Sequence, residues 1–227
     1  MRIYIIRHAD PDYANDTLTP NGHQEAEALA QYLQTQKIDE IYSSPLGRTQ
    51  DTAQYAADLL CLPVSIEPWA QELETPWIKN LNRAFFPGVE AGVNSAFSSG
   101  YTTPEPPDSS LYDCEMQLIR QGSNDFMRRQ GFLYQDGIYG VQQENRKGVA
   151  VFTHMGVGLI WLSHLLNIPL PMVWSGFFLH PASITTILMD ERSPGFAIPR
   201  CIGLGDISHL CKDGLQPRPA GILANYQ

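Results

Sequence analysis

Two histidines of this 227-residue chain stand directly after short apolar runs. His8 comes after the run Ile3 to Ile6 and Arg7, and His154 comes after the run Gly148 to Thr153. Runs of this kind predict buried strands, and the carboxyl ends of parallel strands form the ligand crevice of a doubly wound sheet. We therefore expect both imidazoles in one crevice. A single histidine at a strand end is usually a structural residue, and it is the paired placement that favours a functional site.

A third polar group lies in the segment SSPLGRT, which places Arg48 in the first turn of a predicted helix. Backbone N–H groups and the helix dipole favour an anion at a helix N-terminus. A guanidinium adds to such a site because it binds phosphate through two parallel hydrogen bonds. Arg48, Arg7 and the two histidines together predict a phosphate cradle.

This set of side chains suits phosphoryl transfer. The reaction needs positive charge around the equatorial oxygens and a nucleophile in line with the leaving group. Neutral imidazole is a competent nucleophile near neutral pH. Transfer of the phosphoryl group to His8 and then to water needs no metal, so we expect neither a metal nor a cofactor.

The rest of the chain predicts the elements that position these groups. Thr19 and Pro20 open a helix as its N-cap and first residue. The alternation of strands and helices predicts an α/β fold, a three-layer α/β/α sandwich with a mostly parallel central sheet. The pattern predicts further strands at Ile38–Tyr42, Pro63–Ile66 and, as the last strand, Ser183–Met189, and further helices at Leu46–Leu60, Cys114–Gln130 and Gly156–Leu166.

Residues 75 to 112 interrupt this alternation. The segment is rich in Gly, Pro and Ser, yet aromatic residues such as Trp77, Phe85 and Tyr101 are scattered through it. A plain linker would lack these aromatics. We therefore expect one domain over residues 1–227, with an inserted helical and loop cap at about 75–112.

Composition narrows the classes of partner. The formal net charge of −9 argues against a nucleic-acid surface or an anionic membrane as partner. No apolar run approaches the ~20 residues of a membrane span. The four cysteines form no CxxC pair, so we expect buried, reduced thiols and a cytoplasmic protein. A small phosphorylated substrate is the expected partner, and the oligomeric state stays open.

The chain resembles the histidine phosphatase superfamily, also called the phosphoglycerate mutase-like family. The resemblance lies in IIRHADP, LTPNGHQEAEALA, SSPLGRTQDTAQ, VFTHMGVG and the closing segment IGLGDISHL, which together cover most of the chain outside the insert. It implies that His8 is the phosphorylated nucleophile. It also implies that Arg7, Arg48 and His154 bind the phosphate.

The family's general acid is a glutamate shortly after the third strand. The segment EPWAQELE offers Glu72 first and Glu74 second. The chain departs from the family pattern at Ala9 and at Met155-Gly156, where glycines are common. Tyr13, Ala14 and Asn15 stand in place of a tryptophan-asparagine pair, and Thr75-Pro76-Trp77 replaces Gly-x-Trp-Glu-Gly. The last two departures weaken a mutase assignment more than a phosphatase assignment.

Three alternatives stay open beside a phosphatase that acts through a phosphohistidine. A mutase of the phosphoglycerate type is the nearest. A metal-dependent hydrolase would use His8, Asp10 and Asp12 with His154 as ligands, but the neighbouring guanidinium groups of Arg7 and Arg48 would lower its affinity for a cation. A non-catalytic phosphate-binding module would typically lack the nucleophile or the acid.

Overall fold

The computed structural model describes residues 1–74 and 113–218, with side chains from residue 116 in the second range. Within these residues, eight strands form one sheet in the order β5-β4-β8-β1-β9-β10-β7-β6, and a separate two-stranded ribbon joins β2 and β3. The strands of the sheet are β1 (Arg2–Arg7), β4 (Glu40–Ser43), β5 (Val64–Ile66), β6 (Phe132–Gln135), β7 (Ile138–Val141), β8 (Gly148–Thr153), β9 (Ile184–Ser193) and β10 (Phe196–Asp206).

The two halves of the sheet differ in strand direction. From β5 to β1 every pairing is parallel, and from β1 to β6 every pairing is antiparallel. Six of the eight strands described therefore run in one direction, and β9 and β7 run in the other. β1 is a central strand, paired with β8 on one side and β9 on the other.

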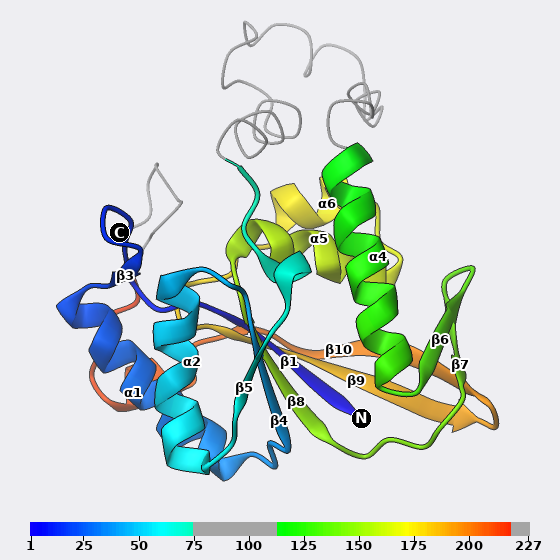
Figure 1. Cartoon of the computed structure of the whole chain (residues 1–227), viewed down its shortest axis with the longest axis horizontal. Coiled ribbons are helices and arrows are strands. Elements are labelled where there is room, and N and C mark those ends of the chain that lie inside the picture. The colour runs from blue at the N-terminus through cyan, green and yellow to red at the C-terminus, as the bar shows by residue number, and fades with distance from the viewer. Residues whose placement is uncertain (75–112, 219–227) are drawn as a thin grey trace, which may run out of the picture.

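Helices cover both faces of the sheet (Figure 1). α1 and α2 lie on one face, and α4, α5 and α6 lie on the other. The expected three-layer α/β/α fold is confirmed. The helices are α1 (Pro20–Thr35), α2 (Gly47–Leu60), α4 (Asp113–Arg129), α5 (Met155–Leu166), α6 (Leu170–Gly176) and α7 (Ser208–Lys212), with a short 3-10 helix η1 (Pro68–Ala70).

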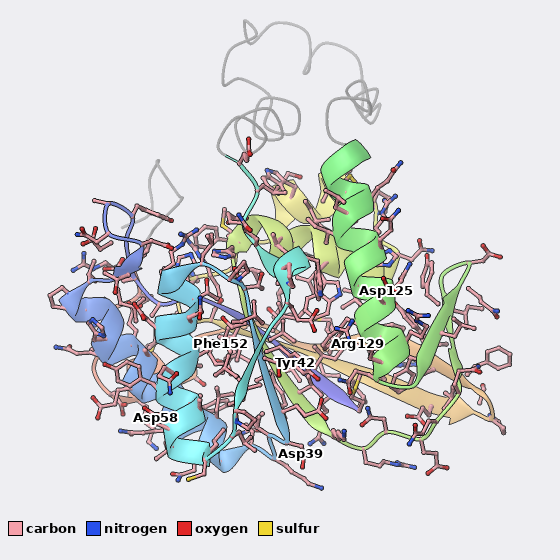
Figure 2. The ribbon with its side chains drawn as sticks, viewed as in Figure 1. Asp39, Tyr42, Asp58, Asp125, Arg129 and Phe152 are labelled. Atoms are coloured by element: carbon pink, nitrogen blue, oxygen red, sulfur yellow. The ribbon has the colours of Figure 1, made fainter. Side chains whose placement is uncertain are left out.

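Alternation along the strands divides the core into two layers. Tyr4 and Ile6 of β1 pack toward α1 and α2, whereas Ile3 and Ile5 pack toward α4 and α5. Phe152 lies in the first layer, and Tyr42 packs against α4 in the second, with its ring 5.1 Å from that of Phe126. Figure 2 labels Tyr42 and Phe152, one side chain from each layer. Because β1 is covered on both faces, the site at its end rests on a rigid support.

Local signals explain where the first helices begin and end. The Thr19 side chain accepts a hydrogen bond from the Gly22 N–H, and Pro20 is the first helical residue, as expected. α2 has no side-chain cap at its N-terminus, Leu46. It ends at Cys61, which adopts the left-handed conformation with φ +55°. The uncapped N-terminus of α2 leaves its backbone N–H groups to other partners.

One expectation about the chain after residue 130 was wrong, and three elements there were not predicted. Ser183–Met189 does not contain the last strand, because β10 follows β9 and pairs with it over much of its length. Pro199, Gly203 and Gly205 hide this strand from a propensity pattern, and register shifts interrupt its ladder. The hairpin of β6 and β7 and the helix α6 were also missed.

The expectation of buried thiols was wrong for Cys61, Cys201 and Cys211, which are free and exposed. They lie at a helix end, on the open side of β10 and on the surface helix α7, where no core packs over them. The expected cap at 75–112 lies outside the described residues. In the described part of the chain, no helix is both long and apolar enough to cross a membrane.

Candidate active site

Two strand ends place the histidines together. β1 and β8 pair in parallel with Arg7 opposite Thr153, so the next residues, His8 and His154, leave the sheet side by side. Their ring centroids are 5.1 Å apart, with a 60° angle between the planes. Both side chains are buried. The sequence placed them in one crevice for this reason, and the structure brings them into contact.

The hydrogen bond of the His8 ring determines its tautomer. Nδ1 lies 2.8 Å from the carbonyl oxygen of Ala9, which can only accept, so Nδ1 carries the proton. In the neutral ring the lone pair is then on Nε2. Burial, followed by the positive charge of Arg7, holds the pKa of His8 well below its usual range. The imidazole is therefore neutral and has a free electron pair at physiological pH.

The His154 ring has the opposite tautomer. Arg48 Nη2 lies 3.3 Å from Nδ1, and since a guanidinium only donates, Nδ1 accepts. The proton on Nε2 then points to the hydroxyl of Ser44 at 2.8 Å, with that of Thr49 at 3.2 Å. Burial is the main cause that keeps the pKa of His154 well below its usual range. Ser44 and Thr49 thus fix the orientation of this ring.

Arg48 reaches the same edge because β4 lies next to β8. The N–H of Ser44 donates to the carbonyl of Phe152 at 2.9 Å, and α2 begins three residues later. The guanidinium is largely buried, and its Cζ lies 5.3 Å from the centre of the Tyr13 ring. Its Nη1 forms an ion pair with Asp16 at 2.5 Å.

Arg7 approaches from the other side of the crevice. Its Nη1 donates to the carbonyl of Leu179 at 2.6 Å, and its Cζ lies 6.0 Å from the centre of the Phe178 ring. The side chain is buried, and the hydroxyl of Tyr13 accepts a hydrogen bond from it. Arg7 and Arg48 therefore lie on two sides of His8, and both lower its pKa by their charge.

The Glu72 side chain lies against the N-terminus of α5, the helix that begins directly after His154. Its Oε1 accepts from the N–H of Leu73 at 3.1 Å and of Val157 at 3.3 Å, and its Oε2 accepts from that of Gly156 at 3.3 Å. A Cβ at Gly156 would lie 2.7 Å from Oε1, so a glycine allows this approach. Burial raises the pKa of Glu72, although the N–H bonds and Arg7 act in the other direction.

The neighbouring candidates lie elsewhere. Glu74 is exposed, whereas Glu72 bonds to the start of α5 and interacts electrostatically with Arg7. The Asn15 amide donates to Asp12 at 2.7 Å in an exposed turn and does not take part in the cradle. The Asp10 carboxylate accepts from the Thr19 hydroxyl at 2.7 Å. In the described part of the chain, no group of three or more His, Cys, Asp or Glu side chains is arranged to hold a metal ion.

Four residues of the site were missed from the sequence. Ser44 and Thr49 lie within SSPLGRT, and a hydroxyl so close to Arg48 was the available signal. Tyr13 was noted only as a departure from the family pattern, although its ring contacts Arg48 and lies 6.4 Å from that of His8. Asp16 gave no signal, because a carboxylate in a polar loop is usually solvated.

Comparisons with known proteins show which proteins this chain is similar to. Residues 3–84 match the model of the histidine phosphatase superfamily (branch 1). Over this range the chain is similar to the histidine phosphatase superfamily. The matched range includes Arg7, His8, Arg48 and Glu72, while His154 lies beyond it.

Two curated proteins that are similar to parts of this chain carry mutase names. This chain is 30% identical over 117 residues to "Probable phosphoglycerate mutase GpmB" of Enterobacter sp. (strain 638). The matched segment makes up 48% of this chain and 54% of the relative. The chain is 32% identical over 89 residues to the protein of the same name from Yersinia pestis (strain Pestoides F), which is 35% of this chain and 41% of the relative. The matches thus span about half the length of these relatives, or less.

Solved structures of two phosphatases align with nearly the whole chain. Phosphoserine phosphatase of Entamoeba histolytica, in complex with 3-phosphoglyceric acid, covers 92% of this chain and 98% of its own, with a TM-score of 0.63 and 23% identity. The α-ribazole phosphatase of Shigella flexneri covers 91% and 96%, with a TM-score of 0.57 and 19% identity. At these identities the likeness establishes the fold.

Proposed function

We propose that this chain is a phosphatase that hydrolyses small phosphomonoesters through a phosphohistidine intermediate on His8. The observation that carries the proposal is the hydrogen bond from His8 Nδ1 to the Ala9 carbonyl. It leaves the Nε2 lone pair available in a crevice that contains two guanidinium groups. A buried neutral imidazole beside two positive charges is suited to attack on a phosphate that those charges bind.

In the first step, Nε2 of His8 attacks phosphorus in line with the ester oxygen. The P–N bond forms as the P–O bond breaks, and the electron pair of the broken bond stays on the leaving oxygen. Glu72 supplies the proton which that oxygen needs. Its raised pKa favours the protonated form, and the negative charge of a bound phosphate raises it further.

In the second step, water attacks the phosphorus and gives its proton to the Glu72 carboxylate. The P–N bond breaks, and its electron pair returns to Nε2. While phosphorus occupies Nε2, the ring keeps its proton on Nδ1 and is cationic. The Ala9 carbonyl stabilises this cation, and the departing imidazole is neutral, so it needs no further proton.

Arg7, Arg48 and His154 bind the phosphoryl oxygens in this scheme. In the structure, Nδ1 of His154 is an acceptor and cannot donate to a phosphate while the ring is neutral. A phosphate dianion beside it favours protonation at Nδ1. Substrate binding therefore brings a proton to His154, and the ring then donates a charge-assisted hydrogen bond.

The proposal is tested by rapid quench with phosphomonoesters of small alcohols, sugars and hydroxy acids. We expect acid-labile phosphate on His8 and release of inorganic phosphate. A product in which phosphate has moved to another hydroxyl of a phosphosugar acid, without free phosphate, would instead identify a mutase. We place the activity in the cytoplasm, because the free thiols of Cys61, Cys201 and Cys211 suit a reducing compartment.

A further inference from the structure

The carboxylate of Asp16 contacts two groups, the Nη1 end of the Arg48 guanidinium (its outer edge) and the first backbone N–H of α2. Oδ1 lies 2.5 Å from Arg48 Nη1, and Oδ2 accepts from the backbone N–H of Gly47 at 2.7 Å. Gly47 is the first residue of α2. The chain's own carboxylate therefore binds a helix-terminal N–H group that would otherwise be available to a bound anion.

The other edge of the Arg48 guanidinium, formed by Nη2 and Nε, is its inner edge and faces His154 in the crevice. Nη2 reaches His154, and Nε is buried without a hydrogen-bond partner among the described residues. The Tyr13 ring lies against the face of the guanidinium. The group is thus bound along one edge and covered on one face, while the edge formed by Nη2 and Nε carries its remaining donors.

Glycine at position 47 is a condition of this arrangement. A Cβ on Gly47 would lie 2.2 Å from the carbonyl oxygen of Asp16, far inside van der Waals contact. Asp16 itself adopts the left-handed region with φ +49°, which a non-glycine residue rarely does. The loop therefore fits closely on the start of α2 through both its backbone and its side chain.

We propose that Asp16 is a positioning residue for Arg48. By binding the outer edge of the guanidinium, it turns the inner edge toward the phosphoryl group in transfer. The inference rests on the proposed function, because it takes Arg48 as a ligand of that group. Asp16 is also a negative charge beside the cradle, so it opposes the binding of any phosphate while it improves alignment in the transition state.

These two effects predict that a change at Asp16 alters binding of the transition state and binding of ground-state phosphate in different ways. Asp16→Asn should lower kcat by about tenfold or more, because a small misplacement of a catalytic group is costly. Inhibition by vanadate, which imitates the transition state, should weaken by a similar factor. Inhibition by inorganic phosphate should be unchanged or tighter. A merely structural role would reduce the active fraction and leave both inhibition constants unchanged.

A second variant disturbs the contact between Asp16 and Arg48 by a change at Gly47 instead of at Asp16. Gly47→Ala keeps the carboxylate but displaces its loop, so it should reproduce the changes in kcat and vanadate inhibition. Asp58→Asn is the matched control, since Asp58 is an exposed carboxylate at the far end of α2 (Figure 2). Circular dichroism and Tm establish that each variant is folded.

A double-mutant cycle with Arg48→Ala separates this inference from the proposed function. If Asp16 acts through Arg48, Asp16→Asn should have little further effect in the Arg48→Ala background. An equal effect in both backgrounds, or vanadate inhibition unchanged by Asp16→Asn, would overturn the inference. Loss of activity in Arg48→Ala with an unaffected Asp16→Asn leaves the phosphatase proposal standing. Full activity in both His8→Ala and Arg48→Ala removes that proposal itself.

Discussion

The rings of His8 and His154 are 5.1 Å apart, yet they carry their protons on different nitrogens. His8 is protonated on Nδ1 because it faces a carbonyl oxygen, and His154 on Nε2 because Arg48 donates to its Nδ1. The pKa values of both are lowered by burial. In the proposed mechanism these two tautomers serve different tasks, because His8 attacks phosphorus and His154 accepts a proton when an anion binds.

The first prediction concerns the nucleophile. His8→Ala should lower kcat/KM more than about a thousandfold, because the covalent step is lost. The fold should persist, which Tm measures. His23→Ala is the control, since this histidine lies on α1 and contacts Tyr55 instead of the crevice. Activity of His8→Ala within about tenfold of wild type would contradict the mechanism.

The second prediction concerns the general acid. Glu72→Gln should lower the rate with alkyl phosphates by about 10²–10⁴-fold, because the alkoxide then leaves without a proton. An aryl ester such as p-nitrophenyl phosphate has a better leaving group and should lose much less. Glu74→Gln is the control, since this residue is exposed. Equal losses with both substrates would show that Glu72 serves binding or structure instead.

The third prediction concerns pH. The lowered pKa of His8 means that its neutral form persists on acidification, so loss of its lone pair should affect kcat/KM only below pH 6.5. The pKa of Glu72 is raised above 4.5, so its acid form disappears as the pH rises through that raised value. With one alkyl phosphate, Glu72→Gln should remove the alkaline decline that is expected for wild type. Since the substrate is the same, its own ionisation cancels. Persistence of that decline would assign it to another group.

The fourth prediction concerns the arginine cradle. Arg48→Ala should lower kcat by about 10²–10³-fold, as for removal of a donor to a developing charge. Arg48→Lys should recover part of the activity, because an ammonium supplies charge but not the planar arrangement that contacts Asp16, His154 and phosphate together. The measurement is kcat together with inhibition by vanadate. A lysine variant as active as wild type would place Arg48 outside the reaction.

The fifth prediction concerns metals. Activity should survive EDTA, because guanidinium groups and a protonated His154 supply the positive charge. Asp12→Asn should also leave activity unchanged, since this half-buried side chain accepts a hydrogen bond from Asn15 and has no contact with the crevice residues in the hydrogen bonds described. Loss of activity on chelation, with recovery on adding zinc or manganese, would favour the alternative in which Asp10 and Asp12 are ligands.

The sequence predicted those parts of the site that depend on strand ends and on a helix start. Apolar runs identified β1 and β8, and parallel pairing brings their ends together whatever the loops do. A preference between Glu72 and Glu74 rested on the family resemblance, because two carboxylates in an extended segment point to the same side. Burial at the start of α5 distinguishes them, and burial there depends on packing between distant segments.

The parts that were not predicted depend on backbone conformations with weak sequence signals. Asp16 reaches Arg48 through a left-handed residue in a polar loop, and nothing in its neighbours required that conformation. β10 contains Pro199 and two glycines, which are residues that argue against a strand, yet its long pairing with β9 compensates for them. Tertiary pairing overrides local preference at such positions.

The position of β1 in the sheet also sets the order in which the molecule can assemble. β1 is synthesised well before its two neighbours, which begin at Gly148 and Ile184. During synthesis the strand that precedes His8 therefore stays unpaired until most of the chain has left the ribosome. Contacts of such long sequence separation form slowly. Catalytic competence should thus appear late in refolding, after the helices have formed, and nascent chains that end before β9 should bind chaperones and not phosphate.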